Sequence, residues 1–253
     1  MMLTNENYFT LENNMKYMGT SQFKAFEKCQ AGALAEIKGE YVREKTPALL
    51  VGSYVDSHFE KSLDLFKAQN PDIFKKNGEL LEKFNHANRI IERIEKDDLF
   101  MKYMSGQKQV IQTGEIEGVL FKTKIDSYLP GECLVDLKIM ADFESKWQDG
   151  LKISFVEFWG YDIQAAIYQH NESNKLPFII AGATKEKEPN LELLSIPQQR
   201  IDYCLDLVRQ NAPLYANIKL GLIEPTRCGT CDYCKSKKVL TGVIDYNLLE
   251  VGE

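Results

Sequence analysis

GVLFKTKIDSYLPGECLVDLKI, residues 118–139, is the stretch around which we expect the rest of the chain to fold. Residues 118–128 alternate between apolar and polar side chains, which predicts a β-strand with two different faces. Pro130-Gly131 is a strong turn signal, and a second strand is expected over residues 133–139. The stretch therefore predicts a hairpin of two strands.

Three charged side chains of this hairpin are expected to share one small volume. Asp136 and Lys138 lie two residues apart on the second strand and leave the same face, and Asp126 lies near the turn on the first strand. Two carboxylates in one pocket repel each other unless a cation lies between them, and carboxylate oxygens are ligands that Mg²⁺ or Mn²⁺ prefers. Lys138 could then position or deprotonate a metal-bound water, or stabilise a transition state. An exposed hairpin with scattered charges is the alternative.

The sequences ID at 125–126 and DLK at 136–138 resemble the core of the PD-(D/E)xK nucleases. More narrowly, they resemble the RecB-like and phage RecE-like exonucleases, whose core reads G…K.riD…vvDlKt. Ile125 stands where the family name has proline, a replacement that is common in this branch. The resemblance implies an α/β, restriction-endonuclease-like fold with a central mixed β-sheet flanked by helices.

The resemblance also implies roles for the core residues. Asp126 and Asp136 would bind one or two Mg²⁺ or Mn²⁺ ions, assisted by the backbone carbonyl of Ile139. Lys138 would orient or activate the attacking water. The implied reaction is the hydrolysis of phosphodiester bonds in DNA.

Two segments before the hairpin extend the resemblance. MGTSQFKAFEKCQAGAL, residues 18–34, resembles the opening of the family, and its helical pattern begins near Thr20-Ser21. Residues 48–60 resemble the family helix GtavHa..e. Asp56 stands where relatives usually have a metal-contacting His, so the resemblance implies an oxygen ligand there; a solvated helix charge is the alternative.

A third matching segment follows the hairpin. WGYDIQAAIYQH, residues 159–170, resembles the family helix Y..Qa..Y and lies within a helix expected over residues 153–170. The resemblance implies that Gln164 and Tyr161 line the metal pocket. The spacing alone favours a half-buried helix with amphipathic aromatic side chains.

The cysteine-rich segment at residues 227–238 carries a second type of signal. Cys228, Cys231 and Cys234 have the spacing C-x₂-C-x₂-C, which fits Zn²⁺ or an iron–sulfur cluster, and Cys29 is the natural fourth ligand. Some RecB-like nucleases hold a [4Fe-4S] cluster with one early and three late cysteines, although their last gap is usually longer. A cluster, Zn²⁺ and unmetallated thiols all remain open, and a metal here would be structural.

The other segments supply the scaffold. The patterns predict a long amphipathic helix over residues 77–104, a strand before the hairpin over 107–117 and a loop over 141–150. Two further strands are expected over 176–184 and 191–196, and a final helix over 197–218.

Composition limits the class of protein. The chain has 253 residues, 44% apolar and 27% charged, which fits one nuclease domain over residues 1–253. No apolar run of about 18 residues and no signal-peptide pattern is present, so we expect a cytoplasmic protein without a membrane partner. Six cysteines in such a chain indicate free thiols or metal binding. The net charge of −6 argues against a bulk polyanion binder but allows a basic groove.

The resemblance implies an exodeoxyribonuclease of the phage recombination type. It would digest duplex DNA from its ends and leave a single strand for an annealing protein; a homo-oligomer is left open. Two alternatives remain: an iron–sulfur nuclease of the helicase-linked or CRISPR-adaptation type, and a non-catalytic DNA-binding protein with the same fold.

Overall fold

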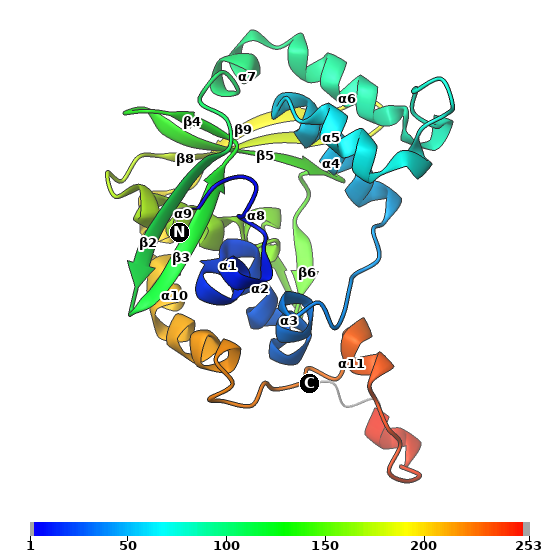
Figure 1. The fold of residues 1–253 in the computed structure, drawn as a ribbon, viewed down its shortest axis with the longest axis vertical. Coiled ribbons are helices and arrows are strands. Elements are labelled where there is room, and N and C mark those ends of the chain that lie inside the picture. Colours follow the sequence, from blue (N-terminus) through cyan, green and yellow to red (C-terminus); the bar gives the residue numbers. More distant parts are fainter. Residues whose placement is uncertain (1–2, 250–253) are drawn as a thin grey trace.

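The computed structural model describes residues 3–249 (Figure 1). The strands, in chain order, are β1 (Met18–Gly19), β2 (Val110–Ile116), β3 (Val119–Ile125), β4 (Ser127–Leu129), β5 (Cys133–Met140), β6 (Lys146–Gln148), β7 (Leu151–Ile153), β8 (Phe178–Thr184) and β9 (Leu191–Ser195). The α-helices are α1 (Leu11–Lys16), α2 (Thr20–Lys28), α3 (Gln30–Ile37), α4 (Pro47–Phe59), α5 (Leu63–Gln69), α6 (His86–Glu95), α7 (Asp98–Tyr103), α8 (Phe155–Phe158), α9 (Tyr161–Glu172), α10 (Gln198–Lys219) and α11 (Asp232–Ser236). Short 3₁₀ turns are η1 (Pro71–Ile73), η2 (Glu82–Phe84) and η3 (Tyr246–Leu249).

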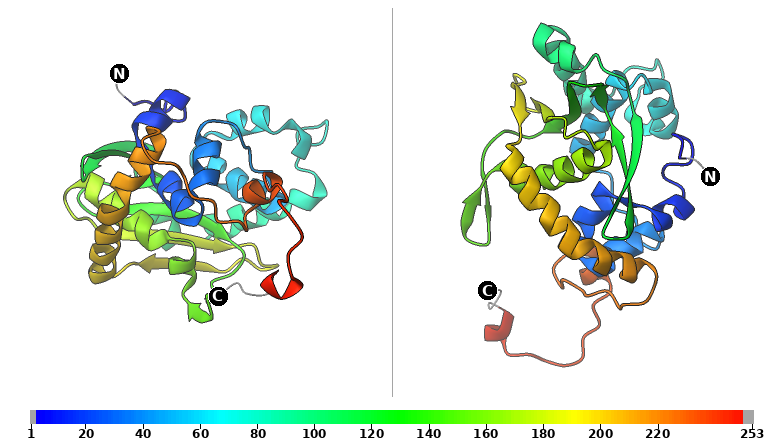
Figure 2. Two further views of the ribbon diagram at one scale, coloured as in Figure 1. Left: turned by 90° about the horizontal axis from the view of Figure 1, so that it is seen from below. Right: turned by 90° about the vertical axis from the view of Figure 1, so that its left-hand side faces the viewer.

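The strands form mixed sheets, as predicted. One sheet has the order β4-β5-β8-β9, in which β5 and β8 are parallel and the other pairs antiparallel. A second sheet has the order β1-β3-β2, and β6 with β7 forms a separate hairpin that projects from the body of the molecule (Figure 2). Helices cover these sheets, so the expected restriction-endonuclease-like α/β architecture is confirmed.

The central hairpin differs from the expectation in its pairing. β3 pairs with β2 and not with β5, while the Pro130-Gly131 turn joins β5 only to the short β4. Asp126 occupies the break between β3 and β4, where the chain passes from one sheet to the other. An alternating pattern does not specify which neighbour a strand chooses, because that choice depends on contacts between distant segments.

Alternation along β5 places two different layers on its two faces. Val135 and Leu137 pack in a core cluster with α4 and α6, whereas Leu134 packs in another cluster with α9. Asp136 and Lys138 share the parity of Leu134, so they leave β5 on the α9 side. Figure 1 shows α4–α7 grouped on one side of this sheet.

Three expected elements are divided. The helix expected over residues 77–104 is broken into η2, α6 and α7, and the side chain of Asp97 caps the start of α7. The helix expected over 153–170 is divided at Gly160, whose φ of 63° lies in the left-handed region. The loop expected over 141–150 contains β6, and Asp149-Gly150 forms the turn to β7, with positive φ at both residues.

The remaining scaffold predictions agree with the structure. The strands expected over 176–184 and 191–196 are β8 and β9, and the helix expected over 197–218 is α10. The helix expected from Thr20 is present but is interrupted at Cys29, which ends α2 and caps α3. Within residues 3–249, no helix is both long and apolar enough to cross a membrane.

Candidate active site

Asp136 and Lys138 project together from β5, as the strand period requires. The Asp136 side chain is buried, and the Lys138 ammonium forms an ion pair with its Oδ2 atom. From α9, Gln164 Nε2 donates a hydrogen bond of 2.6 Å to Asp136 Oδ1. The carboxylate is therefore fixed by two side chains from two elements.

Asp126 reaches the same place through the break between β3 and β4. Its Oδ2 atom accepts a 2.9 Å hydrogen bond from the backbone N–H of Leu137, the residue between Asp136 and Lys138. Its Oδ1 atom accepts a 3.3 Å hydrogen bond from Gln109 Nε2, which also donates to Glu60 Oε1 at 2.7 Å. The side chain of Asp126 thus connects the two sheets where their pairing stops.

Asp56 enters from α4. The helix packs against the end of β5, since a Cβ added at Gly52 would lie 3.9 Å from the backbone oxygen of Ile139. Asp56 Oδ1 is buried and has no hydrogen-bond partner among residues 3–249. His58 is not part of this group, because its Nε2 atom lies 2.8 Å from Glu95 Oε1.

Two carboxyl groups of the site, Asp56 and Asp126, have raised pKa values. Burial, then the Asp126 charge, raises the pKa of Asp56 well above its usual value. Burial, then the Asp136 charge, raises the pKa of Asp126 to about 7. Burial alone would lower the pKa of Lys138, but Asp136 and Asp126 outweigh it and raise this pKa, so Lys138 stays charged. The site has an excess of buried acidic oxygen that one ammonium does not neutralise.

These residues fit a divalent oxygen-binding cation. The donors are carboxylates from α4, β5 and the β3–β4 break, and the Ile139 carbonyl lies where α4 meets β5. The buried Oδ1 atom of Asp56 lacks a partner, and hard cations such as Mg²⁺ and Mn²⁺ favour this donor set.

The acidic group faces a cavity of about 530 Å³. Asp56, Asp126, Asp136, Lys138 and Gln164 all line it, together with lysines from α2 and β3 and with residues of the N-terminal segment: Lys24, Lys122, Lys124, Tyr8 and Phe9. The cavity therefore combines acidic groups in its interior with lysines on its walls.

The ring of Tyr161 lies close to two lysine side chains of the site, Lys138 and Lys24. The Lys138 ammonium lies 5.5 Å from the centre of its ring, and the Lys24 ammonium lies 5.4 Å from it. Burial raises the pKa of the Tyr161 hydroxyl. Tyr168, two helical turns later on α9, lines the cavity, and its hydroxyl donates to the Lys124 backbone oxygen at 2.9 Å.

A comparison with protein families decides the class of the chain. The family described as "PDDEXK-like domain of unknown function (DUF3799)" matches residues 19–237. The chain belongs to this PDDEXK-like family. It is thus a member of the PD-(D/E)xK nuclease superfamily, as the sequence core indicated.

Solved structures include a near relative of this PDDEXK-like protein. The crystal structure of a candidate exonuclease from Eubacterium rectale is 46% identical, covers 100% of both chains and has a TM-score of 0.93. The crystal structure of SSO0001 is 11% identical over 83% of this chain and 88% of that one, and its TM-score of 0.27 is too low to inform the fold. A comparison with curated proteins gives no match.

Several site residues of the PDDEXK-like protein carried no signal in the sequence. Gln109 precedes β2 and bridges two acidic side chains, yet isolated glutamines have no pattern. Lys24 lies on the helix expected from Thr20, but nothing in that pattern singles it out, and Tyr8 with Phe9 lies outside every segment that carries the resemblance. The acidic residues could be found because they belong to a motif, whereas the residues around them become neighbours only through the fold.

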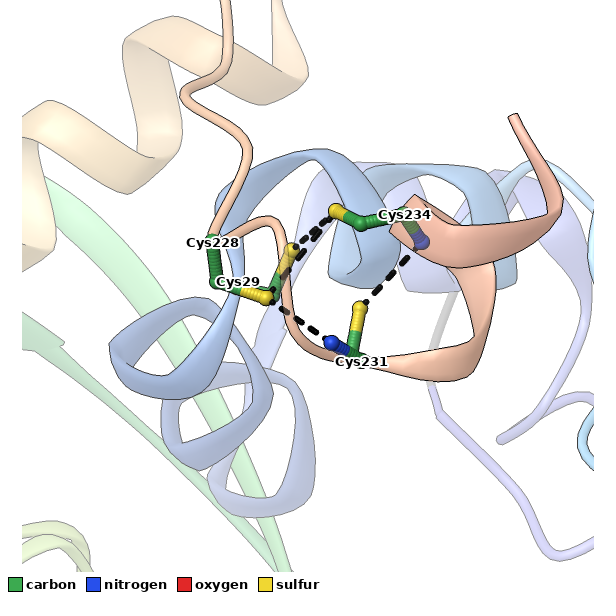
Figure 3. A group of neighbouring side chains, drawn as sticks. All are labelled: Cys29, Cys228, Cys231 and Cys234. Carbon is green, nitrogen blue, oxygen red and sulfur yellow. Dashed lines mark hydrogen bonds between the residues drawn. The ribbon is translucent and has the colours of Figure 1, made fainter. Parts of the chain in front are cut away.

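The four cysteines singled out in the sequence do come together (Figure 3). Their sulfur atoms all lie within 4.8 Å of one another, with Cys29 Sγ 3.6 Å and Cys228 Sγ 3.9 Å from Cys234 Sγ. Cys29 lies at the α2–α3 junction, and the other three surround the start of α11. This cysteine cluster can hold a metal ion and lies apart from the acidic cavity, which none of its members lines.

Proposed function

We propose that the protein is a Mg²⁺- or Mn²⁺-dependent exodeoxyribonuclease that hydrolyses phosphodiester bonds at the ends of duplex DNA. The observation that supports this proposal is the convergence of Asp56, Asp126, Asp136 and Lys138 on one cavity from three separate segments. Scattered surface charges would have no reason to meet in this way. Membership in the nuclease superfamily supports the same reaction class.

Asp126 and Asp136 would hold the divalent ion, with Asp56 and the carbonyl oxygen of Ile139 as additional ligands. Such an ion supplies a nucleophilic water at neutral pH and stabilises charge on the phosphate. Gln164 keeps Asp136 in one orientation through its 2.6 Å hydrogen bond. A fixed ligand orientation raises metal affinity, because no rotamer has to be selected on binding.

Lys138 acts as a charged group in this proposal. The neighbouring carboxylates raise its pKa above the usual value, so its ammonium is protonated and donates hydrogen bonds. It therefore orients the attacking water and stabilises negative charge on the phosphate. Deprotonation of the water by Lys138 fits this electrostatic environment poorly.

The lysines on the cavity wall suit the backbone of DNA. Lys24 and Lys124 are partly exposed and line the cavity beside the acidic group, and accessible ammonium groups bind phosphates without regard to sequence. We propose that the substrate end enters here. The relative described as a candidate exonuclease supports digestion from an end.

Four finer points complete the proposal. A recombination role and a product strand taken by an annealing protein rest on the resemblance to phage RecE-like enzymes. Action in the cytoplasm and one nuclease domain spanning residues 1–253 rest on the composition and patterning of the sequence. Homo-oligomerisation is compatible with this role.

One experiment separates the functional classes. Purified protein is incubated with end-labelled linear duplex, circular duplex and single-stranded DNA, with Mg²⁺, Mn²⁺ or EDTA. We expect metal-dependent digestion of linear duplex only, and a loss of at least about 100-fold in Asp136→Ala and in Lys138→Ala. Circular dichroism shows whether each variant is folded. Cleavage of circles would indicate an endonuclease, and binding of DNA without cleavage by any metal would indicate a non-catalytic protein.

A further inference from the structure

The sulfur atoms of the cysteine cluster are too close together for an iron–sulfur cubane. All four lie within 4.8 Å of one another, and two pairs lie at 3.6 and 3.9 Å. Each cysteine of a [4Fe-4S] cluster binds a different iron atom, which separates the sulfurs by roughly 6 Å. The cluster held by some RecB-like nucleases therefore does not fit the residues as they lie here.

The same separations fit one tetrahedral ion. Four thiolates around Zn²⁺ at a bond length of about 2.3 Å lie about 3.8 Å from one another. The short pairs, Cys29 with Cys234 and Cys228 with Cys234, match this value closely. We propose that Cys29, Cys228, Cys231 and Cys234 form a closed, structural Zn²⁺ site.

Backbone N–H groups already point at three of these sulfurs. Gly32 N lies 3.4 Å from Cys29 Sγ, Cys231 N lies 3.3 Å from Cys228 Sγ, and Cys234 N lies 3.5 Å from Cys231 Sγ. Donors aimed at sulfur favour the thiolate, which is the form that binds metal. The backbone around the cluster is thus arranged for charged sulfur ligands.

The segment that carries the late cysteines has little else to hold it. Between residues 221 and 247, Cys234 is the one buried residue, and few apolar side chains face the body of the protein. Two hydrogen bonds to the backbone of Thr226 fix its start: Ala31 N donates to Thr226 O at 3.0 Å, and Thr226 N donates to the side-chain oxygen Gln30 Oε1 at 2.9 Å. Because so few apolar side chains of this segment are buried, hydrophobic packing contributes little free energy to its folding. A bound structural metal ion can supply the missing stabilisation in such small units.

The zinc site would support a wall of the cavity. Cys29 ends α2 and begins α3, and both helices contribute lining residues, among them Lys24 and Glu36. Binding of Zn²⁺ would fix this corner to the C-terminal segment. The site is structural, because all four ligands come from the chain and leave no open position.

Metal analysis of the full chain tests the proposal. We expect about one Zn²⁺ per chain, no iron and no colour, and visible bands of tetrahedral cobalt thiolate after exchange with Co²⁺. Cys228→Ser removes an exposed ligand without opening the core, and we expect it to lose the zinc and to melt about 5–10 °C lower. Trypsin should then cut faster after Arg227. Cys204→Ala, a buried cysteine outside the cluster, should keep its zinc.

Two results would overturn the zinc site. One is iron with acid-labile sulfide and brown colour in protein purified without oxygen. The other is reduced protein that takes up no metal when titrated with Zn²⁺ alone. Neither depends on nuclease activity, and Asp136→Ala should retain zinc, so the two proposals fail independently.

Discussion

Asp136 is held by two side chains that act in different ways. Lys138 supplies charge, and Gln164 supplies a directed hydrogen bond of 2.6 Å from α9. Removing the Lys138 charge would change the electrostatics of the whole site, whereas removing the Gln164 amide would only let the Asp136 carboxylate rotate. Gln164 is therefore the better probe of geometry.

We expect Gln164→Ala to reduce nuclease activity by roughly 10–100-fold and to raise the Mn²⁺ concentration needed for half-maximal rate. Gln169→Ala is a matched control, because this amide is buried on the same helix but bonds to Leu176 and Gln198. Both variants should lose some stability, and only the first should lose activity. Equal rates for the two variants, measured over a Mn²⁺ titration, would contradict a positioning role.

A second residue-scale feature is the buried Lys219, which has no acidic partner among residues 3–249. Lys219 Nζ donates to the backbone oxygen of Tyr17 at 2.8 Å and to Gln22 Oε1 at 3.2 Å. Burial, then the charge of Lys122, lowers the pKa of Lys219 to about 7. The unfolded chain keeps a value of about 10.4, so it binds more protons than the folded protein between these values.

Stability should consequently rise as the pH increases from about 7 towards 10. We expect the free energy of unfolding, from urea denaturation, to increase by at least about 1 kcal/mol more between pH 7 and 9 in the wild type than in Lys219→Met. The variant serves as the reference for all other titrating groups. Identical pH profiles for the two proteins would show that the buried ammonium is not responsible.

At the scale of elements, the break between β3 and β4 determines where Asp126 lies. It turns the chain from one sheet to the other and leaves Asp126 free to bond the backbone of β5. Gly106 lies against this break, since an added Cβ would lie 2.5 Å from the backbone oxygen of Tyr128 and 2.8 Å from Ser127 Oγ. A backbone atom cannot yield as a flexible side chain can.

We expect Gly106→Ala to lower the free energy of unfolding by about 1–3 kcal/mol and to reduce activity, because β4 must shift beside Asp126. Gly242→Ala is the control, since nothing lies within 4 Å of its added Cβ. Urea denaturation and a nuclease assay measure both effects. If Gly106→Ala behaves like Gly242→Ala, β4 is not a rigid support of the site.

At the scale of the whole molecule, the charge distribution matters more than the total. The chain carries a net charge of −6, yet two partly exposed lysines, Lys24 and Lys124, line one cavity. Local positive charge can attract a phosphate backbone even when the overall charge is negative. DNA binding should therefore depend strongly on salt.

We expect Lys124→Gln to weaken binding of duplex DNA, measured in Ca²⁺ or EDTA to prevent cleavage. The slope of log affinity against log salt should fall by about 1, as for one lost phosphate contact. Lys96→Gln is the control, because this exposed lysine ends α6 and does not line the cavity. Equal slopes for the two variants would place the DNA elsewhere.

Much of the fold could be predicted from local pattern. The strands β8 and β9, the helix α10 and the start of α2 at Thr20 follow from periodicity that a single segment carries. The breaks within helices were harder to predict from the sequence. Cys29 and Asp97 cap the helices that follow them with their side chains, and neither is a strong helix breaker such as proline. The choice of β2 as the partner of β3 has no local signal at all.

The sequence by itself determined the acidic core and the cysteine spacing, because motifs record which residue types a chemistry requires. Only the tertiary structure decided that Asp126 bonds Leu137 across a strand break, that Gln109 joins two carboxyls, and that four sulfurs lie close enough for one ion. The physical reason is that distances between segments far apart in sequence follow from packing of the whole chain, which no single segment encodes.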